Sequence, residues 1–147
     1  MWSVNNAKKL VIHNKASAFE MCIKTEGESK EILKDAISDY IELSKKGWLL
    51  QRRFKIEKPY ELITSNELKS TFDRGSWEKF NERYPNSGGY IELSTVGFNK
   101  DKTVAIVHMG HYCGSLCGGG TFYVLQKKEG KWRQLTRSRW TSCFWIS

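Results

Sequence analysis

The hydrophobic positions of the chain follow a helical period in its first half. Between Ser29 and Lys46, apolar residues recur at steps of one and three, which is typical of one buried face of a helix. Glutamates near the start and lysines near the end of this segment match the helix dipole, and Gly47 is suited to end the helix. We therefore predict a helix over Ser29–Lys46, with the following stripe facing the core: Ile32, Leu33, Ala36, Ile37, Tyr40 and Ile41.

Shorter elements follow this helix. Residues 48–56 follow as an expected strand, which Pro59 closes. Thr64 and Glu67 have the spacing of a capping box, which predicts a short helix to about Phe72. Aromatic residues at steps of three and four predict another helix over Ser76–Tyr84.

From Tyr90 onward the pattern changes to apolar runs separated by turn residues, which is typical of antiparallel strands. The last residues are expected to pair or pack back on these strands. The predicted strands are Tyr90–Phe98, Thr103–Tyr112, Thr121–Lys127 and Lys131–Trp140.

These elements predict a single α+β domain over residues 1–147. We expect N-terminal helices packed on one face of a curved antiparallel β-meander of four to six strands. Within it, residues 1–26 form an arm or edge strand, 29–85 are mainly helical with one strand, and 90–147 form the meander.

The net charge of +8 favours an anionic ligand or another anionic partner, although such a charge also serves solubility. The apolar runs are far shorter than the roughly 20 residues of a membrane-spanning helix. The N-terminal segment lacks the pattern of a signal peptide, which predicts a cytoplasmic protein. The alternative is an exported protein whose leader has been removed.

The segment from His108 to Gly120 holds the most reactive side chains. Two histidines and two cysteines are zinc ligands by type, but they lie too close together in sequence, and His108 and His111 should point to opposite faces of a strand. We therefore expect no metal site. Cys113 and Cys117 could form a disulfide across a hairpin loop, or could be buried as reduced thiols.

Three other roles are open for this loop. His111 could activate Cys113 as a nucleophile. The backbone N–H groups around Gly114 and Gly118 could bind an anion. Alternatively, Gly114 and Gly118–Gly120 could serve only a tight turn with left-handed backbone conformations. The loop lacks the lysine and hydroxyl residue that end a nucleotide-binding loop, so we expect no nucleotide hydrolysis and no cofactor.

The predicted strand from Lys131 to Trp140 carries basic residues on one side. Lys131, Arg133, Arg137 and Arg139 share this side, and Trp132 and Trp140 share the other. Basic and aromatic residues together suit single-stranded nucleic acid. The alternative is a solvated outer face with both tryptophans buried.

Three segments carry a resemblance to a known family. Ser94–Asn99, Cys113–Gly120 and Gly130–Trp132 resemble a Ser-x-Val-Gly-Phe-Asn strand, a Cys-Gly-x-Leu-Cys-Gly-x-Gly loop and a strand with Gly-Lys-Trp. This pattern is that of a family of small, mostly bacterial, uncharacterised proteins, many of whose members look exported or lipid-anchored. The order of elements is also similar to that of the cystatin and NTF2-like group, whose folds host unrelated functions.

The function favoured by these observations is a non-enzymatic module that binds a ligand or a protein. Its candidate binding residues are His111, Cys113, Gly114, Cys117, Gly118, Lys131, Arg133, Arg137 and Arg139. The two alternatives are an enzyme built on His111 and Cys113, and nucleic-acid binding through Lys131–Arg139. No residue is assigned a catalytic role.

Overall fold

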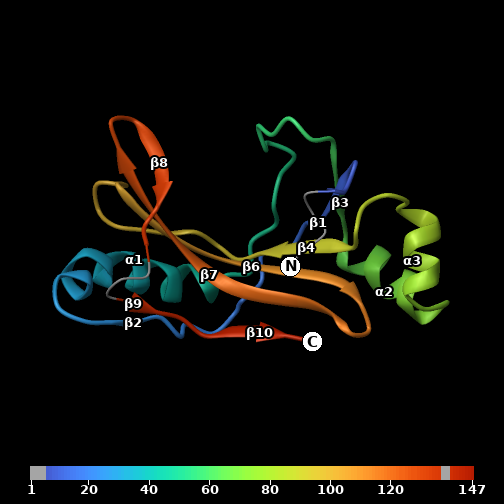
Figure 1. The fold of residues 1–147 in the computed structure, drawn as a ribbon, viewed down its shortest axis with the longest axis horizontal. Helices are drawn as coiled ribbons and strands as arrows, with labels where there is room; N and C mark the ends of the chain where they lie inside the picture. Colours follow the sequence, from blue (N-terminus) through green and yellow to red (C-terminus); the bar gives the residue numbers. More distant parts are fainter. Residues whose placement is uncertain (1–5, 137–139) are drawn as a thin grey trace.

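The computed structural model describes residues 6–136 and 140–147. In this part of the chain, three helices accompany a mostly antiparallel sheet of eight strands that is not closed (Figure 1). The fold is therefore α+β, as predicted, but the sheet has more strands than the four to six expected. Its strands run in the order β10-β7-β6-β4-β1-β3, with β5 beside β6 and β8 beside β7.

The large sheet is built from strands of very different length. β6 and β7 have 11 and 12 residues, whereas the others have four or fewer. A separate two-stranded sheet pairs β2 (Lys24–Thr25) with β9 (Trp140–Thr141). The strands of the large sheet are β1 (Leu10–His13), β3 (Tyr60–Ile63), β4 (Tyr90–Leu93), β5 (Gly97–Phe98), β6 (Val104–Gly114), β7 (Cys117–Lys128), β8 (Lys131–Gln134) and β10 (Phe144–Ile146).

The three helices begin and end close to the predicted positions. They are α1 (Glu28–Ser44), α2 (Ser65–Asp73) and α3 (Trp77–Arg83). The capping box at the start of α2 is confirmed, because the Glu67 N–H donates to Thr64 Oγ1 and the Thr64 N–H donates to Glu67 Oε2, each at 3.1 Å. The Ser76 side chain accepts a hydrogen bond at the start of α3 in the same way.

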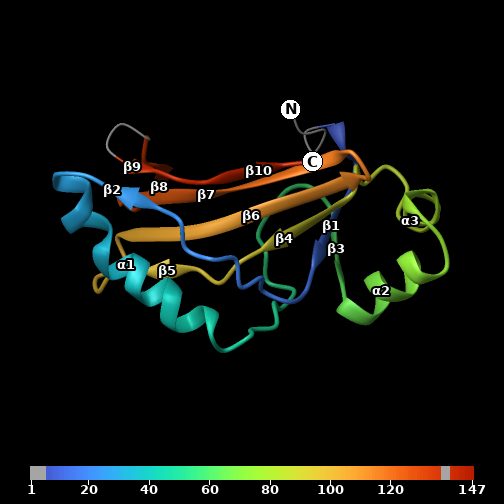
Figure 2. The same ribbon diagram turned by 90° about the horizontal axis from the view of Figure 1, so that it is seen from below.

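In Figure 2, α1 and α2 lie below the sheet near its opposite ends, and α3 lies beyond the end near α2. α1 buries Leu33, Ala36 and Tyr40 in a core cluster with side chains of β6 and β7. At the other end, Leu68 of α2 and Phe80 of α3 pack with Val11 and Ile63 in a second cluster. The core is thus divided into two parts along one face of the sheet.

The predicted strand over residues 48–56 is wrong. In this segment only Leu49 forms an isolated β-bridge, with Lys15, and its side chain is exposed. The strand lies later, at β3, which pairs in parallel with β1, so the sheet is not purely a meander. β1 also pairs in parallel with β4, and it therefore lies inside the sheet rather than at its edge.

The predicted strand over Lys131–Trp140 is also too long. β8 ends at Gln134, after which the Leu135 N–H donates to the Val124 carbonyl at 2.8 Å. Leu135 packs against the core, and Trp140, which is 2% exposed, is buried in it. Burial of these two apolar side chains turns the chain away from the β7–β8 hairpin.

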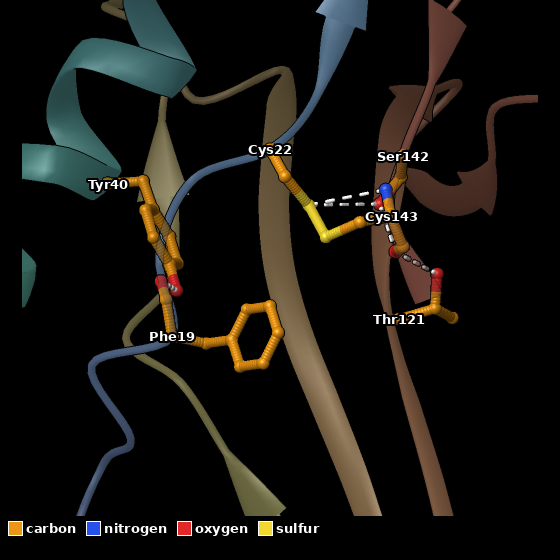
Figure 3. The surroundings of a disulfide bond; sticks show 6 residues. All are labelled: Phe19, Cys22, Tyr40, Thr121, Ser142 and Cys143. Atoms are coloured by element: carbon orange, nitrogen blue, oxygen red, sulfur yellow. Dashed lines mark hydrogen bonds between the residues drawn. A yellow bond between two sulfur atoms is a disulfide. The ribbon is translucent and has the colours of Figure 1, made fainter. Parts of the chain in front are cut away.

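The segment between β1 and α1 crosses the core. It is held both to α1 and to the C-terminal part of the chain. The Tyr40 hydroxyl donates to the Phe19 carbonyl at 2.7 Å. The sulfur atoms of Cys22 and Cys143 lie at disulfide distance, with their Cα atoms 5.8 Å apart (Figure 3). The Cys143 N–H also points to the Cys22 sulfur, at 3.2 Å. This contact links residues 121 positions apart in sequence.

No helix in the described part of the chain is both long and apolar enough to cross a membrane.

The two cysteine pairs should differ in their effect on stability. In the oxidised protein, Cys22→Ser/Cys143→Ser opens a loop of about 120 residues and should lower the free energy of unfolding by about 4–5 kcal/mol. Cys113→Ser/Cys117→Ser opens a loop of about five residues and should lower it by about 2 kcal/mol. Denaturant unfolding of both double variants, beside a thiol count of the denatured wild type, checks this. Equal losses, or four titratable thiols without reductant, would contradict the pairing.

Candidate functional site

The predicted reactive loop is the turn between β6 and β7. Gly114 pairs with Cys117 across this turn, and the sulfur atoms of Cys113 and Cys117 lie at disulfide distance, with Cα atoms 5.1 Å apart. A cysteine in a disulfide has no thiolate to act as a nucleophile or metal ligand. In this state, Cys113 cannot act as a nucleophile activated by His111, which was one of the open alternatives.

His111 is buried, and its imidazole ring forms a hydrogen bond with a backbone carbonyl. Its Nε2 lies 2.7 Å from the Gly88 carbonyl, so this nitrogen carries a proton and donates it. Burial lowers the pKa of His111, and the bond to Gly88 opposes this in part. The turn holding Gly88 approaches β6 so closely that Gly89, at φ +98°, has no room for a side chain. His111 therefore acts as an anchor for this turn.

His108 faces the opposite side of the sheet, as the strand period predicts. Its ring stacks on Phe19 at 3.8 Å and meets Phe122 edge-on. Its Nε2 is buried and has no hydrogen-bond partner among the described residues. Burial lowers the pKa of His108 to about 4, although the charge of Glu92 raises it. In residues 6–136 and 140–147, no group of three or more His, Cys, Asp or Glu side chains could hold a metal ion.

The glycines of this segment have a different role from the one expected. Gly114 and Gly118–Gly120 lie in β6 and β7, and none of them has a positive φ, so the predicted left-handed turn conformations are wrong. Instead, Gly118 and Gly120, together with Gly110 of β6, leave room for Trp145 of β10. A methyl group at Gly120 would lie 2.8 Å from Trp145 Cε2, and one at Gly110 would lie 3.3 Å from its Cζ2. The Trp145 indole therefore packs directly against the backbone of Gly110 and Gly120.

The predicted basic residues lie at the other end of the β6–β7 hairpin from the cysteine turn. Lys131 and Arg133 lie in β8 and are exposed. Because β6 is 11 residues long, roughly 35 Å of strand separates them from the cysteine turn. Arg137 and Arg139 lie outside the described residues. The structure therefore does not bring the two sets of candidate binding residues together.

Other cations, which the sequence analysis did not assign to a site, join Lys131 and Arg133. Lys128 is opposite Lys131 in the β7–β8 register, and Lys127 is beside them. The Lys127 N–H donates to the Thr103 carbonyl at 2.7 Å, which brings the turn with Lys100 and Lys102 to the same end of the sheet (Figure 1). We call these six residues the basic end: Lys100, Lys102, Lys127, Lys128, Lys131 and Arg133.

An exposed tryptophan lies within the basic end. Trp132 is 41% exposed, its ring centre is 6.1 Å from that of Phe98, and the Lys127 ammonium lies 5.8 Å from it. No ion pair among the described residues involves a cation of the basic end. Antiparallel pairing could have indicated this grouping, since it places the turns at residues 99–102 and 129–130 at one end of the sheet.

A scan against protein-family models, a search of curated proteins and a search of solved structures each found no match. The resemblance to the small bacterial family and to the NTF2-like layout therefore stays a prediction.

The fit of Trp145 on the glycines can be tested with a double-mutant cycle. Gly120→Ala forces the indole away and should lower the free energy of unfolding by about 1–3 kcal/mol. In a Trp145→Ala background the same change should cost much less, because the space is then open. Equal costs in both backgrounds, measured by denaturant unfolding, would show that Gly120 is needed for another reason.

The buried His108 should make the protein less stable in mild acid. The unfolded histidine has a pKa near 6.5 and the folded one near 4, so between these values the unfolded state binds more protons. The free energy of unfolding should fall as the pH drops from 7 to 5, by at most about 1.4 kcal/mol per pH unit from this residue. Urea unfolding at both pH values should show a smaller decrease in His108→Leu; an unchanged decrease would contradict the assignment.

Proposed function

We propose that this chain is a binding module whose basic end takes a polyanion, and that single-stranded nucleic acid is the polyanion it fits best. The observation that supports this most directly is the grouping of six cations without ion-pair partners at one end of the sheet. There Lys127 and the partly exposed Trp132 lie on one face of the β7–β8 hairpin, and Lys128, Lys131 and Arg133 on the other. Phosphates interact with such a surface through charge, whereas the ring adds a base-stacking contact.

The distribution of charge supports a local site rather than a general surface effect. The cations of the basic end come from the β5–β6 turn, β7 and β8, and the turns also hold Asp101 and Glu129. Three carboxylates of α1, those of Asp35, Asp39 and Glu42, line a pocket with Lys100 and Lys102. Elsewhere several lysines are paired, for example Lys34 with Glu31 at 3.1 Å and Lys45 with Glu42 at 2.9 Å. At the basic end, by contrast, none of the six cations forms an ion pair with a described residue.

The other functions are supported less well. An enzyme based on His111 and Cys113 would need a free thiol and an accessible imidazole, whereas Cys113 lies at disulfide distance from Cys117 and His111 is buried. Anion binding by the glycine-rich strands would need free backbone N–H groups, whereas Gly118–Gly120 lie between paired strands.

The charge contribution is tested by binding to a labelled single-stranded oligonucleotide at several salt concentrations. Lys128→Glu/Lys131→Glu should weaken binding at least tenfold at low salt and reduce the slope of log K against log salt by about 1.4, if two phosphate contacts are lost. Lys30→Glu/Lys69→Glu, at exposed positions of α1 and α2, makes the same change in net charge and serves as the control. Equal effects of both double variants would show that only net charge matters.

The aromatic contribution has a matched control as well. Trp132→Ala should weaken oligonucleotide binding by about 1–3 kcal/mol and leave binding of inorganic polyphosphate, which has no bases, unchanged. Trp48 is 44% exposed and has a lysine 5.9 Å from its ring, so Trp48→Ala controls for loss of a similar side chain elsewhere. Equal loss of both ligands in Trp132→Ala would limit the proposal to a polyanion without a role for stacking.

A further inference from the structure

Three polar side chains from distant parts of the chain meet where β1 joins α2. His13 Nε2 lies 2.8 Å from Ser65 Oγ, and His13 Nδ1 lies 3.3 Å from Glu92 Oε1. A single imidazole thus contacts a hydroxyl through one nitrogen and a carboxylate through the other. This is the relation of nucleophile, base and orienting acid in serine hydrolases.

The sheet holds the three residues in place. His13 is the last residue of β1 and is opposite Ile63 of β3, which leads through Thr64 into α2 at Ser65. On its other side, β1 pairs with β4 through Ile12 and Ile91, so Glu92 comes next to His13. The Asn14 N–H donates to the Ile63 carbonyl at 2.8 Å and fixes the strand ends. Rigid neighbours of this kind are what a preorganised site requires.

The three side chains differ in their exposure to water. Ser65 is exposed, whereas the side chains of Glu92 and His13 are 25% and 12% exposed. A substrate can therefore reach the hydroxyl, while the imidazole is largely shielded from water. The carboxylate lies within ion-pair distance of His13 Nδ1, at 3.3 Å, although this nitrogen has no hydrogen-bond partner among the described residues.

The start of α2 supplies donors for a developing oxyanion. The Thr64 hydroxyl accepts from the Glu67 N–H, and the first intrahelical bond runs from the Leu68 N–H to the Thr64 carbonyl. The N–H groups of Ser65 and Asn66 precede this bond and have no acceptor within the helix. They belong to the first turn of α2, at the positive end of the helix dipole.

We infer that Ser65, His13 and Glu92 form a site for acyl transfer from small carboxylic esters, separate from the basic end. In the first step the Ser65 oxygen bonds to the ester carbonyl carbon, and His13 Nε2 takes the hydroxyl proton. The carbon–alkoxide bond then breaks, and His13 returns the proton to the departing alcohol. Water cleaves the acyl-Ser65 ester in the same way, which releases the carboxylic acid and restores the hydroxyl. Glu92 acts as a positioning residue for His13.

The inference is tested on the full chain with p-nitrophenyl acetate and with a fluorophosphonate that labels activated serines. The wild type should hydrolyse the ester and should carry the phosphonate on Ser65, as read by peptide mass spectrometry. Ser65→Ala should abolish both signals. Ser70→Ala, which removes a hydroxyl from the same helix, should change neither.

The variants of the other two residues separate catalysis from structure. His13→Gln should lower the rate by roughly 10²–10⁴-fold, the usual contribution of a general base. Glu92→Gln should lower kcat by less, with KM unchanged, because it affects only the orientation of His13. If the phosphonate labels Ser65 no faster than other serines, or if wild type and Ser65→Ala hydrolyse the ester equally, the inference is wrong. Should His13→Gln unfold, the Ser65→Ala and Glu92→Gln results still decide it.

Discussion

The pairing of β6 with β7 is the interaction on which the rest of the structure depends. The two strands stay in one register from Val104 opposite Gln126 to Tyr112 opposite Gly118, and an irregularity follows before the cysteine turn. This ladder supplies Ile106, Phe122 and Val124 to the core under α1. It also carries the basic end and the cysteine turn at its opposite ends, so neither could move without a change in register.

The division of the core into two clusters explains where polar chemistry can occur on the helical side of the sheet. α1 covers the part around Ile106 and Phe122, and α2 with α3 covers the part around Val11 and Ile63. Glu92 lies in β4, opposite Gly110 of β6, and its side chain is 25% exposed, so water can reach its carboxylate in part. A charged group is tolerated there because it is paired and not fully desolvated. The charged side chains of the basic end, by contrast, lie in water.

The features that were predicted from sequence are those that local interactions determine. The capping box of Thr64 and Glu67 depends on residues three positions apart. The helical stripe of α1 is just as local, and it is confirmed at Leu33, Ala36 and Tyr40, whereas Ile32 and Ile41 are exposed. The parallel pairing of β1 with β3 joins segments about 50 residues apart and leaves no local pattern. The glycines of β7 were misread because their partner, Trp145, is distant in sequence. The same holds for His13, Ser65 and Glu92, which share no motif, and for the basic end, of which only the part in β8 was visible as a pattern.

The interior position of β1 has a consequence for how this protein folds. Because β1 needs β3 and β4 as neighbours, its hydrogen bonds must wait until residues near 60 and near 90 have been brought to it, which requires closure of long loops. The edge strand β10 is added only from the last residues of the chain. Proteins whose contacts join distant segments in this way fold slowly, over milliseconds to seconds, compared with helical proteins of similar size. During synthesis, the N-terminal strand therefore emerges long before its partners and stays without its native pairing until most of the chain is present.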